Sequence, residues 1–199
     1  PLVRRGRFVT DSRIVRRMAR GLVIVDIQND YFPGGANPLE GPEAAAAQAA
    51  RLLARFRESG DPLVHMQHVW DAPDAAFMAP GTAGVEIHES VAPRPGETVI
   101  QKRHPNSFLD TELEQRLRDA GVDRLVVCGM MTSMCVDATV RAGADLGFPV
   151  VVAHDACATM PLEFKGRTIP AADVHAAFLA ALADSYAEVV GAGSLVDGR

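Results

Sequence analysis

Three side chains with complementary chemistry each follow an apolar run that has the composition of a β-strand. Asp26 ends the first of these runs, Lys102 follows the third, and Cys135 lies shortly after the fourth. Parallel strands present their carboxyl ends at one edge of a sheet, where ligands bind, so we expect these three groups to meet there. A thiol can attack a carbonyl carbon, a carboxylate can take its proton, and an ammonium can stabilise the charges that form. The spacing therefore predicts a site for nucleophilic catalysis.

The sequence around Cys135 favours a reactive thiol. The segment that leads to it is typical of a strand, a turn and a helix N-terminus, with Thr132 and Ser133 as candidate N-caps. The positive end of a helix and its free N–H groups favour a thiolate and can hold an oxyanion. The alternative is that Cys135 is a small buried hydrophobic residue, as free cysteines commonly are. Cys128, inside an apolar run, fits that second role, whereas Cys157 follows the fifth predicted strand and could line the site.

The two charged candidates also have competitors nearby. A carboxylate at the end of an apolar strand is costly unless it is paired or lies at the wet edge of the sheet, which fits Asp26 as a general base. Asp30 is a second acidic candidate, and its other interpretation is a loop cap that accepts hydrogen bonds from backbone N–H groups. Lys102 would hold Asp26 ionised and favour the thiolate. Arg103 follows directly, and alternation along an extended segment predicts that it points the other way.

Six short apolar runs alternate with longer segments of helical periodicity. This order is typical of βαβ units, and it predicts an α/β chain with a three-layer doubly wound fold, a six-stranded parallel sheet and helices on both faces. The predicted strands are residues 21–26, 62–68, 97–101, 124–129, 149–153 and 187–190. Helices are predicted from residue 42 to a stop at Gly60 and over 110–120, 132–146 and 171–184. The long connections 71–96 and 155–170 are predicted to shape the site.

The charge is distributed unevenly along the chain. Residues 1–20 hold seven Arg and one Asp, so residues 21–199 carry 13 basic against 24 acidic side chains, a net charge of −11. We expect residues 1–20 to be a basic tail, disordered or introduced by cloning with Met18 as the natural start, and residues 21–199 to form a single domain. An acidic body without a basic patch predicts no nucleic-acid partner.

Composition excludes several other classes of protein. The three cysteines lack CxxC spacing, which indicates reduced thiols and a cytoplasmic location rather than a zinc site. No apolar stretch approaches the ~20 residues that a membrane span needs, so we predict no membrane partner. No GxGxxG or GxxxxGK[ST] segment follows a predicted strand, so we expect no nucleotide and no other cofactor. The expected partner is a small-molecule substrate.

Several motifs occur in the order of a known family. Residues 25–32, VDIQNDYF, resemble the D-x-Q-N-D-F motif of the isochorismatase-like superfamily. Residues 102–108, KRHPNSF, resemble its K-x-x-x-S-A-F segment, and residues 129–136, GMMTSMCV, resemble its G-x-x-T-x-x-C-V segment. Shorter matches occur at 81–87 and 155–156. The resemblance runs from about residue 21 to residue 190.

This resemblance implies a Cys-Asp-Lys triad in a hydrolase that cleaves a C–N bond of a small amide, carbamoyl or lactam-type substrate. Asp26 would take the thiol proton, Cys135 would form a thioester acyl-enzyme and Lys102 would stabilise the charges. The family also implies a cis peptide bond between Met130 and Met131, with the N–H groups of Met131 and Cys135 as the oxyanion hole. Members usually form dimers or tetramers, so we expect a homodimer or homotetramer.

The branch of the family follows from two positions. True isochorismatases have Gly where this chain has Cys135, so the cysteine points to C–N hydrolysis. Nicotinamidases add a metal site with an Asp-x-His pattern, which His68-Val69-Trp70 breaks, so we predict no catalytic metal. The residues predicted to contact the substrate are Gln28, Tyr31, His68 and Trp70. The alternatives are a nicotinamidase without the usual ligands and a non-catalytic scaffold of the same fold.

Overall fold

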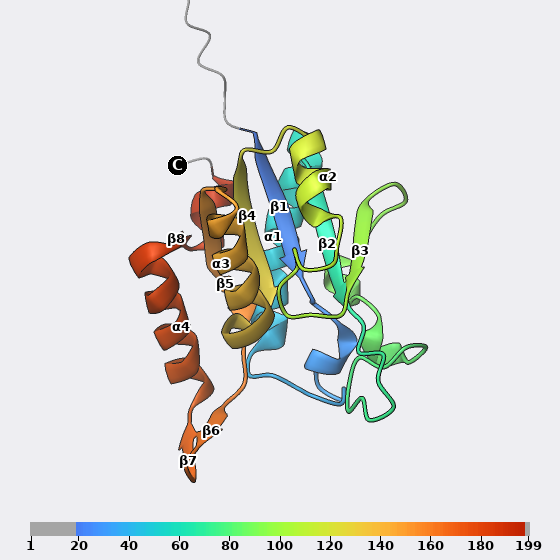
Figure 1. The fold of residues 1–199 in the computed structure, drawn as a ribbon, viewed down its shortest axis with the longest axis vertical. Coiled ribbons are helices and arrows are strands. Elements are labelled where there is room, and N and C mark those ends of the chain that lie inside the picture. The colour runs from blue at the N-terminus through green and yellow to red at the C-terminus, as the bar shows by residue number, and fades with distance from the viewer. Residues whose placement is uncertain (1–18, 198–199) are drawn as a thin grey trace, which may run out of the picture.

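A six-stranded parallel sheet forms the centre of the computed structural model, which describes residues 19–197 (Figure 1). The strand order is β3-β2-β1-β4-β5-β8, and every neighbouring pair is parallel. The strands are β1 (Arg20–Val25), β2 (Leu63–His68), β3 (Thr98–Lys102), β4 (Arg124–Met130), β5 (Val150–Ala158) and β8 (Ala187–Val190). All six predicted strands are present, and the predicted fold class is confirmed.

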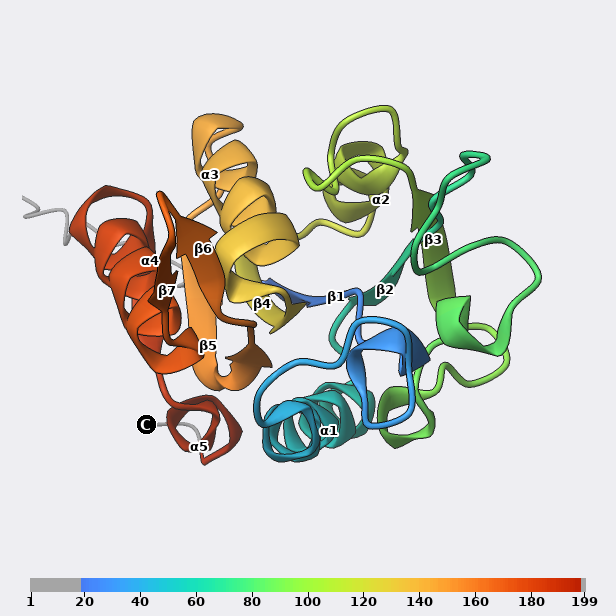
Figure 2. The ribbon, with the colours of Figure 1, turned by 90° about the horizontal axis from the view of Figure 1, so that it is seen from below.

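Helices cover both faces of the sheet (Figure 2). The helices are α1 (Pro42–Ser59), α2 (Leu113–Asp119), α3 (Asp137–Asp145), α4 (Ala171–Ser185) and α5 (Ala192–Val196). Helices α1 and α5 lie against one face, while α2, α3 and α4 lie against the other, which gives the three layers. Within residues 19–197, no helix is both long enough and apolar enough to cross a membrane.

The core consists of two hydrophobic clusters, one on each face of the sheet. Leu22 and Ile24 of β1 pack with Phe56 of α1 in the first cluster. Val23 and Val25 belong to the second, on the other face. From the helices, that second cluster takes Leu113, Leu117, Val140, Leu179 and Leu182. Because both faces of β1 are covered, its sequence is a continuous apolar run, and each such side chain contributes about 1.5–3 kcal/mol when it is buried.

The carboxyl ends of the central strands create the crevice in which a site can form. Strands β2 and β3 lie on one side of β1, and β5 and β8 lie beyond β4 on the other side, so the β1/β4 boundary is a topological switch point. Asp26 directly follows β1, and a π-helical turn, Thr132–Val136, carries Cys135 just after β4. His68 and Lys102 are the last residues of β2 and β3. The fold therefore brings all four side chains to one edge.

The predicted boundary between tail and domain is wrong at Arg20. This residue begins β1, in register with Arg124 of β4, and its guanidinium lies 3.4 Å from the carboxylate of Asp61. A backbone that pairs in the sheet belongs to the domain whatever the charge of its side chain. Residues 1–18 lie outside the described residues, so the expectation for them stays a prediction.

The fifth strand is longer than predicted. Strand β5 continues to Ala158, so Cys157 lies in the strand and not in the loop that the sequence suggests. The polar residues after position 153 suggest that the strand ends there. However, the carboxylate of Asp155 is satisfied within the fold, because it accepts the N–H of Ala192 at 2.7 Å. A hairpin of β6 (Leu162–Phe164) and β7 (Arg167–Ile169) occupies most of the remaining connection.

Gly129 allows β4 to approach β1 closely, because a side chain at this position would collide with the backbone of β1. Its φ is +133°, and a Cβ at this position would lie 1.9 Å from the carbonyl oxygen of Val25. We expect Gly129→Ala to lose about 3 kcal/mol of folding free energy or more, which lowers the melting temperature by about 10 °C. The matched control is Gly193→Ala in α5, where an added Cβ meets no atom within 4 Å. Equal melting temperatures for both variants would contradict the close approach.

Candidate active site

A buried salt bridge between Asp26 and Lys102 lies at the centre of the candidate site. The Lys102 Nζ is 2.7 Å from Asp26 Oδ2, and both side chains are 0% exposed. Burial disfavours the ammonium, but the charge of Asp26 and the contribution of Cys135 together outweigh burial, so the pKa of Lys102 is raised. Asp26 also has a left-handed backbone, with φ of 50°, a strained conformation that clusters at functional sites in non-glycine residues.

Lys102 also fixes the protonation state of His68. Its Nζ lies 3.1 Å from His68 Nδ1 and donates to the carbonyl of His104 at 2.9 Å. Burial lowers the pKa of His68, and the charge of Lys102 lowers it further, so the imidazole is neutral. An ammonium can only donate, so Nδ1 must accept, and the proton of the neutral ring is on Nε2.

The thiol of Cys135 lies beside these groups. Its Sγ is within 4.8 Å of a carboxylate oxygen of Asp26 and of a ring nitrogen of His68. Burial raises the pKa of Cys135, Asp26 raises it further, and Lys102 offsets only part of this increase. The sequence suggests that the helix terminus favours a thiolate, and burial together with the nearby carboxylate acts in the opposite direction. At neutral pH the structure supports a neutral thiol.

Thr132 and Ser133 are not the caps that the sequence suggests. Met131 occupies the N-cap position, and no side chain caps the turn. The hydroxyl of Thr132 donates to the carbonyl of Ala158 at 3.3 Å, and the hydroxyls of Ser133 and Thr159 are 2.8 Å apart. Both hydroxyls therefore tie the π-helical turn to the end of β5.

The turn that carries Cys135 begins with a cis peptide bond between Met130 and Met131. The family resemblance implies a cis geometry at this same bond. The carbonyl of Met131 accepts the N–H groups of Met134 and Val136 at 3.0 and 3.1 Å. These two bonds fix the backbone from which Cys135 projects.

A cavity of about 240 Å³ opens beside Cys135. Its walls are formed by Tyr31, His68, Trp70, Phe77, Arg103, Pro105, Met131, Met134 and Cys135. Three of the four predicted substrate-binding residues thus line it, and so do both residues of the predicted oxyanion hole. Phe77, which packs edge-to-face on Trp70 with ring centroids 5.2 Å apart, was missed. It is the only Phe, Trp or Tyr of the predicted site-shaping connection 71–96, and that signal could have found it.

Gln28, the fourth predicted substrate contact, has a different role. Its Nε2 donates to the carbonyls of His68 and Val85 at 2.8 and 2.7 Å, and its Oε1 accepts the N–H of His68 at 2.8 Å. The side chain is fully buried and does not line the cavity. The side-chain amide of Gln28 thus forms the hydrogen bonds that these buried backbone groups need. Gln28 therefore positions His68 instead of contacting a ligand.

Asp30 organises the loops that form the cavity wall. Its carboxylate accepts the N–H groups of Ala36 at 3.0 Å and Met78 at 2.5 Å, which is the loop-cap interpretation of this residue. Met78 in turn accepts the N–H of Trp70 at 3.0 Å. A Cβ on Gly84 would lie 2.1 Å from Asp30 Oδ1, so only glycine fits beside this carboxylate.

Three potential metal ligands converge here, namely Asp26, His68 and Cys135. However, the ammonium of Lys102 contacts two of them at 2.7 and 3.1 Å and already supplies a positive charge. A metal ion bound here would have to compete with the Lys102 ammonium for Asp26 and His68. The expectation of no catalytic metal stays a prediction that metal analysis of the purified protein can test.

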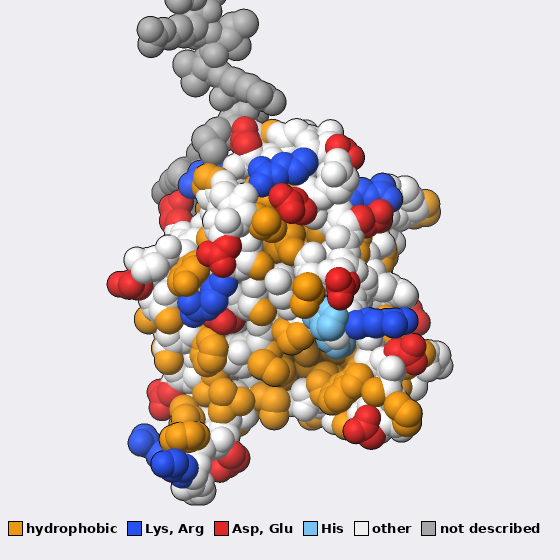
Figure 3. All heavy atoms as spheres, viewed as in Figure 1, with side chains coloured by type: hydrophobic (Ala, Val, Ile, Leu, Met, Phe, Trp, Pro, Cys, Tyr) orange, Lys and Arg blue, Asp and Glu red, His pale blue; other side chains and the backbone are white. Residues whose placement is uncertain are grey.

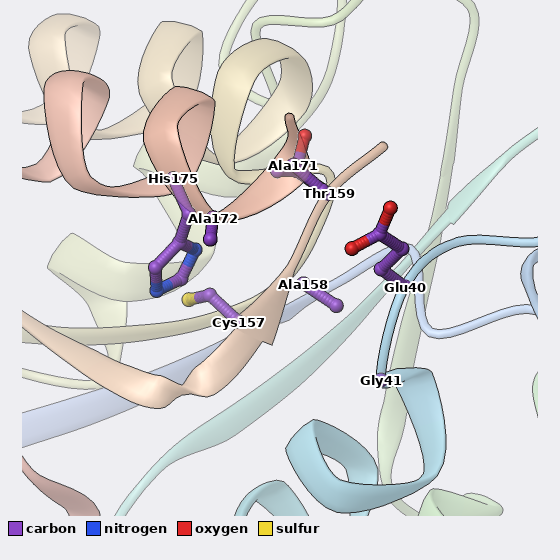
Figure 4. A pocket seen from close by; sticks show the side chains of 8 residues that line it. All are labelled: Glu40, Gly41, Cys157, Ala158, Thr159, Ala171, Ala172 and His175. Carbon is purple, nitrogen blue, oxygen red and sulfur yellow. The ribbon is translucent and has the colours of Figure 1, made fainter. Parts of the chain in front are cut away.

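A second pocket, of about 320 Å³, lies beside the end of β5 (Figure 4). Figure 4 shows Cys157 and His175 on one side of it and Glu40 on the other. Cys157 is 6% exposed, and burial raises its pKa to about 12. It does not line the cavity of Cys135, so it is not part of the same site. Cys128 is fully buried, as predicted.

Comparison with known proteins shows the family of this chain. The family model of the isochorismatase domain matches residues 20–193, which is most of the chain. The chain belongs to the isochorismatase family. The isochorismatase family protein YddQ of Bacillus subtilis is 51% identical over 172 residues, which cover 86% of this chain and 96% of that protein. An isochorismatase hydrolase from Oleispira antarctica has a crystal structure with a TM-score of 0.87 and 51% identity, covering 90% of this chain and 97% of that one.

Other relatives of this isochorismatase-family chain have names that state an activity. Streptothricin hydrolase of Streptomyces noursei is 41% identical over 158 residues, which cover 77% of this chain and 55% of that enzyme. Maleamate amidohydrolase of Pseudomonas putida is 34% identical over 149 residues, or 67% of this chain and 70% of that enzyme. The chain is thus an isochorismatase-family hydrolase whose relatives include amidohydrolases.

The buried salt bridge can be tested by unfolding in urea. Asp26→Asn leaves the Lys102 ammonium without its counter-charge, so we expect a loss of about 3–5 kcal/mol in the free energy of unfolding. The double variant Asp26→Asn with Lys102→Met removes both charges and should recover much of this loss. In the surface control, Glu188→Gln breaks the exposed pair with Arg124 and should cost less than about 1 kcal/mol. If the double variant lost as much free energy of unfolding as Asp26→Asn and Lys102→Met lose together, the two charges would not be coupled.

Proposed function

We propose that this isochorismatase-family hydrolase is a cysteine amidohydrolase that cleaves the C–N bond of a small amide, carbamoyl or lactam-type substrate. The observation that carries the proposal is the fully buried pair of Asp26 and Lys102 beside the thiol of Cys135, at the wall of a cavity large enough for a small molecule. The amidohydrolases among its relatives support the same reaction class.

Asp26 is the general base in this proposal. Since the pKa of Cys135 is raised, its proton has to leave while the sulfur attacks, and an acceptor must be close. Asp26 Oδ2 is paired with Lys102, but Oδ1 accepts no hydrogen bond from residues 19–197 and keeps its lone pairs for this proton. Lys102 supplies the counter-charge that a buried carboxylate needs, at 2.7 Å from Oδ2.

The reaction then proceeds in two halves. The sulfur of Cys135 attacks the carbonyl carbon while Asp26 takes the thiol proton, and the N–H groups of Met131 and Cys135 stabilise the oxyanion. When the intermediate collapses, the C–N bond breaks and the leaving nitrogen takes the proton from Asp26. Water attacks the resulting thioester with Asp26 again as the base. The carboxylic or carbamic acid is released, and the thiol regains its proton.

The cavity walls favour a flat substrate. Trp70, Phe77 and Tyr31 supply aromatic surface, with ring centroids of Tyr31 and Phe77 6.1 Å apart. His68 also lines the cavity, and its neutral ring carries the proton on Nε2, so it can donate a hydrogen bond to a substrate oxygen or nitrogen. The recognised group would therefore be planar and would carry at least one acceptor.

The pH dependence of alkylation by iodoacetamide, measured for each cysteine by mass spectrometry, tests the triad. Asp26→Asn removes a charge that raises the pKa of Cys135, so its alkylation curve should move to lower pH. Lys102→Met removes the charge that lowers this pKa, so its curve should move to higher pH.

Ammonia release from a panel of small primary amides should fall about 10²–10⁴-fold in Asp26→Asn, because the base is gone although the thiol ionises more easily.

Cys157→Ser is the matched control, since it removes a buried thiol outside the cavity and should keep amide turnover, whereas Cys135→Ser should abolish it. Turnover that survives Cys135→Ser would exclude the thioester mechanism. A Cys135 that no reagent modifies and that responds to neither substitution would favour the non-catalytic scaffold.

A further inference from the structure

The cavity beside Cys135 has one permanently charged side chain in its wall, that of Arg103. The other lining side chains are aromatic, aliphatic or sulfur-containing, apart from the neutral imidazole of His68. The catalytic charges of Asp26 and Lys102 are fully buried and compensate each other. A ligand that enters the cavity therefore meets apolar surface and one guanidinium. In the view of Figure 3, a broad hydrophobic area adjoins a histidine and a basic side chain.

Arg103 has hydrogen-bonding capacity left for a ligand. Its partner in residues 19–197 is Asp71, at 3.5 Å through a single nitrogen, and the two side chains are 75% and 59% exposed. A long, exposed contact of this kind contributes little, and a guanidinium has five N–H donors. Asp71 does not line the cavity, and Asp110, the other nearby acid, pairs with His104 at 3.2 Å. No carboxylate in the cavity wall thus competes for Arg103.

The position of Arg103 follows from that of Lys102. Successive side chains of an extended segment point to opposite sides, so the residue after the buried Lys102 points outward. The sequence correctly indicates this opposite direction, but the outward side still reaches the cavity wall. A cation at this place is notable because residues 21–199 carry a net charge of −11, which otherwise repels anions.

We propose that Arg103 selects amide substrates that also carry a carboxylate, so that the amide carbonyl meets Cys135, a flat apolar body fills the aromatic part of the cavity and the carboxylate pairs with the guanidinium. This inference rests on the proposed function and names the substrate class of the same site. Guanidinium and carboxylate groups match geometrically and can form two parallel hydrogen bonds. Asp71 then moderates the charge of Arg103 while the cavity is empty.

The test measures how well matched amides protect Cys135 from iodoacetamide at pH 8. The probes are 4-carbamoylbenzoate, which is anionic, 4-methylbenzamide, which is neutral, and 4-(aminomethyl)benzamide, which is cationic. The quantity compared within each variant is the ratio of half-protecting concentrations of the anionic and neutral probes, so that general changes in reactivity cancel. The variants are Arg103→Gln, Arg103→Lys and Asp71→Asn.

In the wild type we expect the anionic probe to protect at a roughly three- to fivefold lower concentration than the neutral one. Arg103→Gln should abolish this advantage, Arg103→Lys should keep part of it, and Asp71→Asn should increase it. High salt should reduce the advantage, which a purely steric role would not explain. An advantage unchanged in Arg103→Gln, better protection by the cationic probe, or no protection by any probe would overturn the inference.

The two proposals can fail separately. If the anionic preference depends on Arg103 but no amide is hydrolysed, the binding inference stands and the amidohydrolase proposal fails. If amides are hydrolysed through Cys135 but charge has no effect on protection, the amidohydrolase proposal stands and the role of Arg103 is excluded.

Discussion

The buried salt bridge between Asp26 and Lys102 is the interaction on which the rest of the site depends. Two unexposed charges are stable only in each other's presence, so β1 and β3 must end at the same level of the sheet. Strand β2 lies between them, and Lys102 reaches across its end, where it meets His68. Gln28 holds the backbone of His68 on the other side. The geometry of one ion pair thus sets the positions of three strand ends.

The same pair decides how the thiol of Cys135 can react. The ammonium of Lys102 beside the sulfur favours a thiolate, whereas burial and the charge of Asp26 oppose it. The thiol is protonated at rest, because burial and Asp26 raise the pKa of Cys135 by more than Lys102 lowers it. In the proposed mechanism, the proton moves to Asp26 while the sulfur attacks a substrate carbonyl group. The proposed catalysis therefore depends on proton transfer rather than on a preformed anion.

Sequence reasoning succeeded where local pattern decides the structure and failed where three-dimensional surroundings decide it. Apolar runs locate the six strands, and the reactive residues at their ends are brought together by parallel topology. The sequence shows the helix terminus that can favour a thiolate at Cys135, but not the burial and the charge of Asp26 that raise its pKa through space. Gln28 looks like a substrate contact in sequence, yet it satisfies backbone groups, and Asp30 is the loop cap that was one of its two interpretations. The extension of β5 was missed because Asp155 finds its partner 37 residues further along the chain.

Consecutive residues at the end of β3 separate two tasks that both need a positive charge. Lys102 points inward, is fully buried and is neutralised by Asp26, so its field is almost cancelled for a molecule outside. Arg103 points outward, is largely exposed and has only a weak partner, so its charge is felt at the cavity. Because the catalytic pair is electrically neutral, it cannot discriminate between substrates by charge. Discrimination must come from the cavity wall, and there Arg103 is the residue whose substitution can change the preferred substrate without disturbing the buried pair.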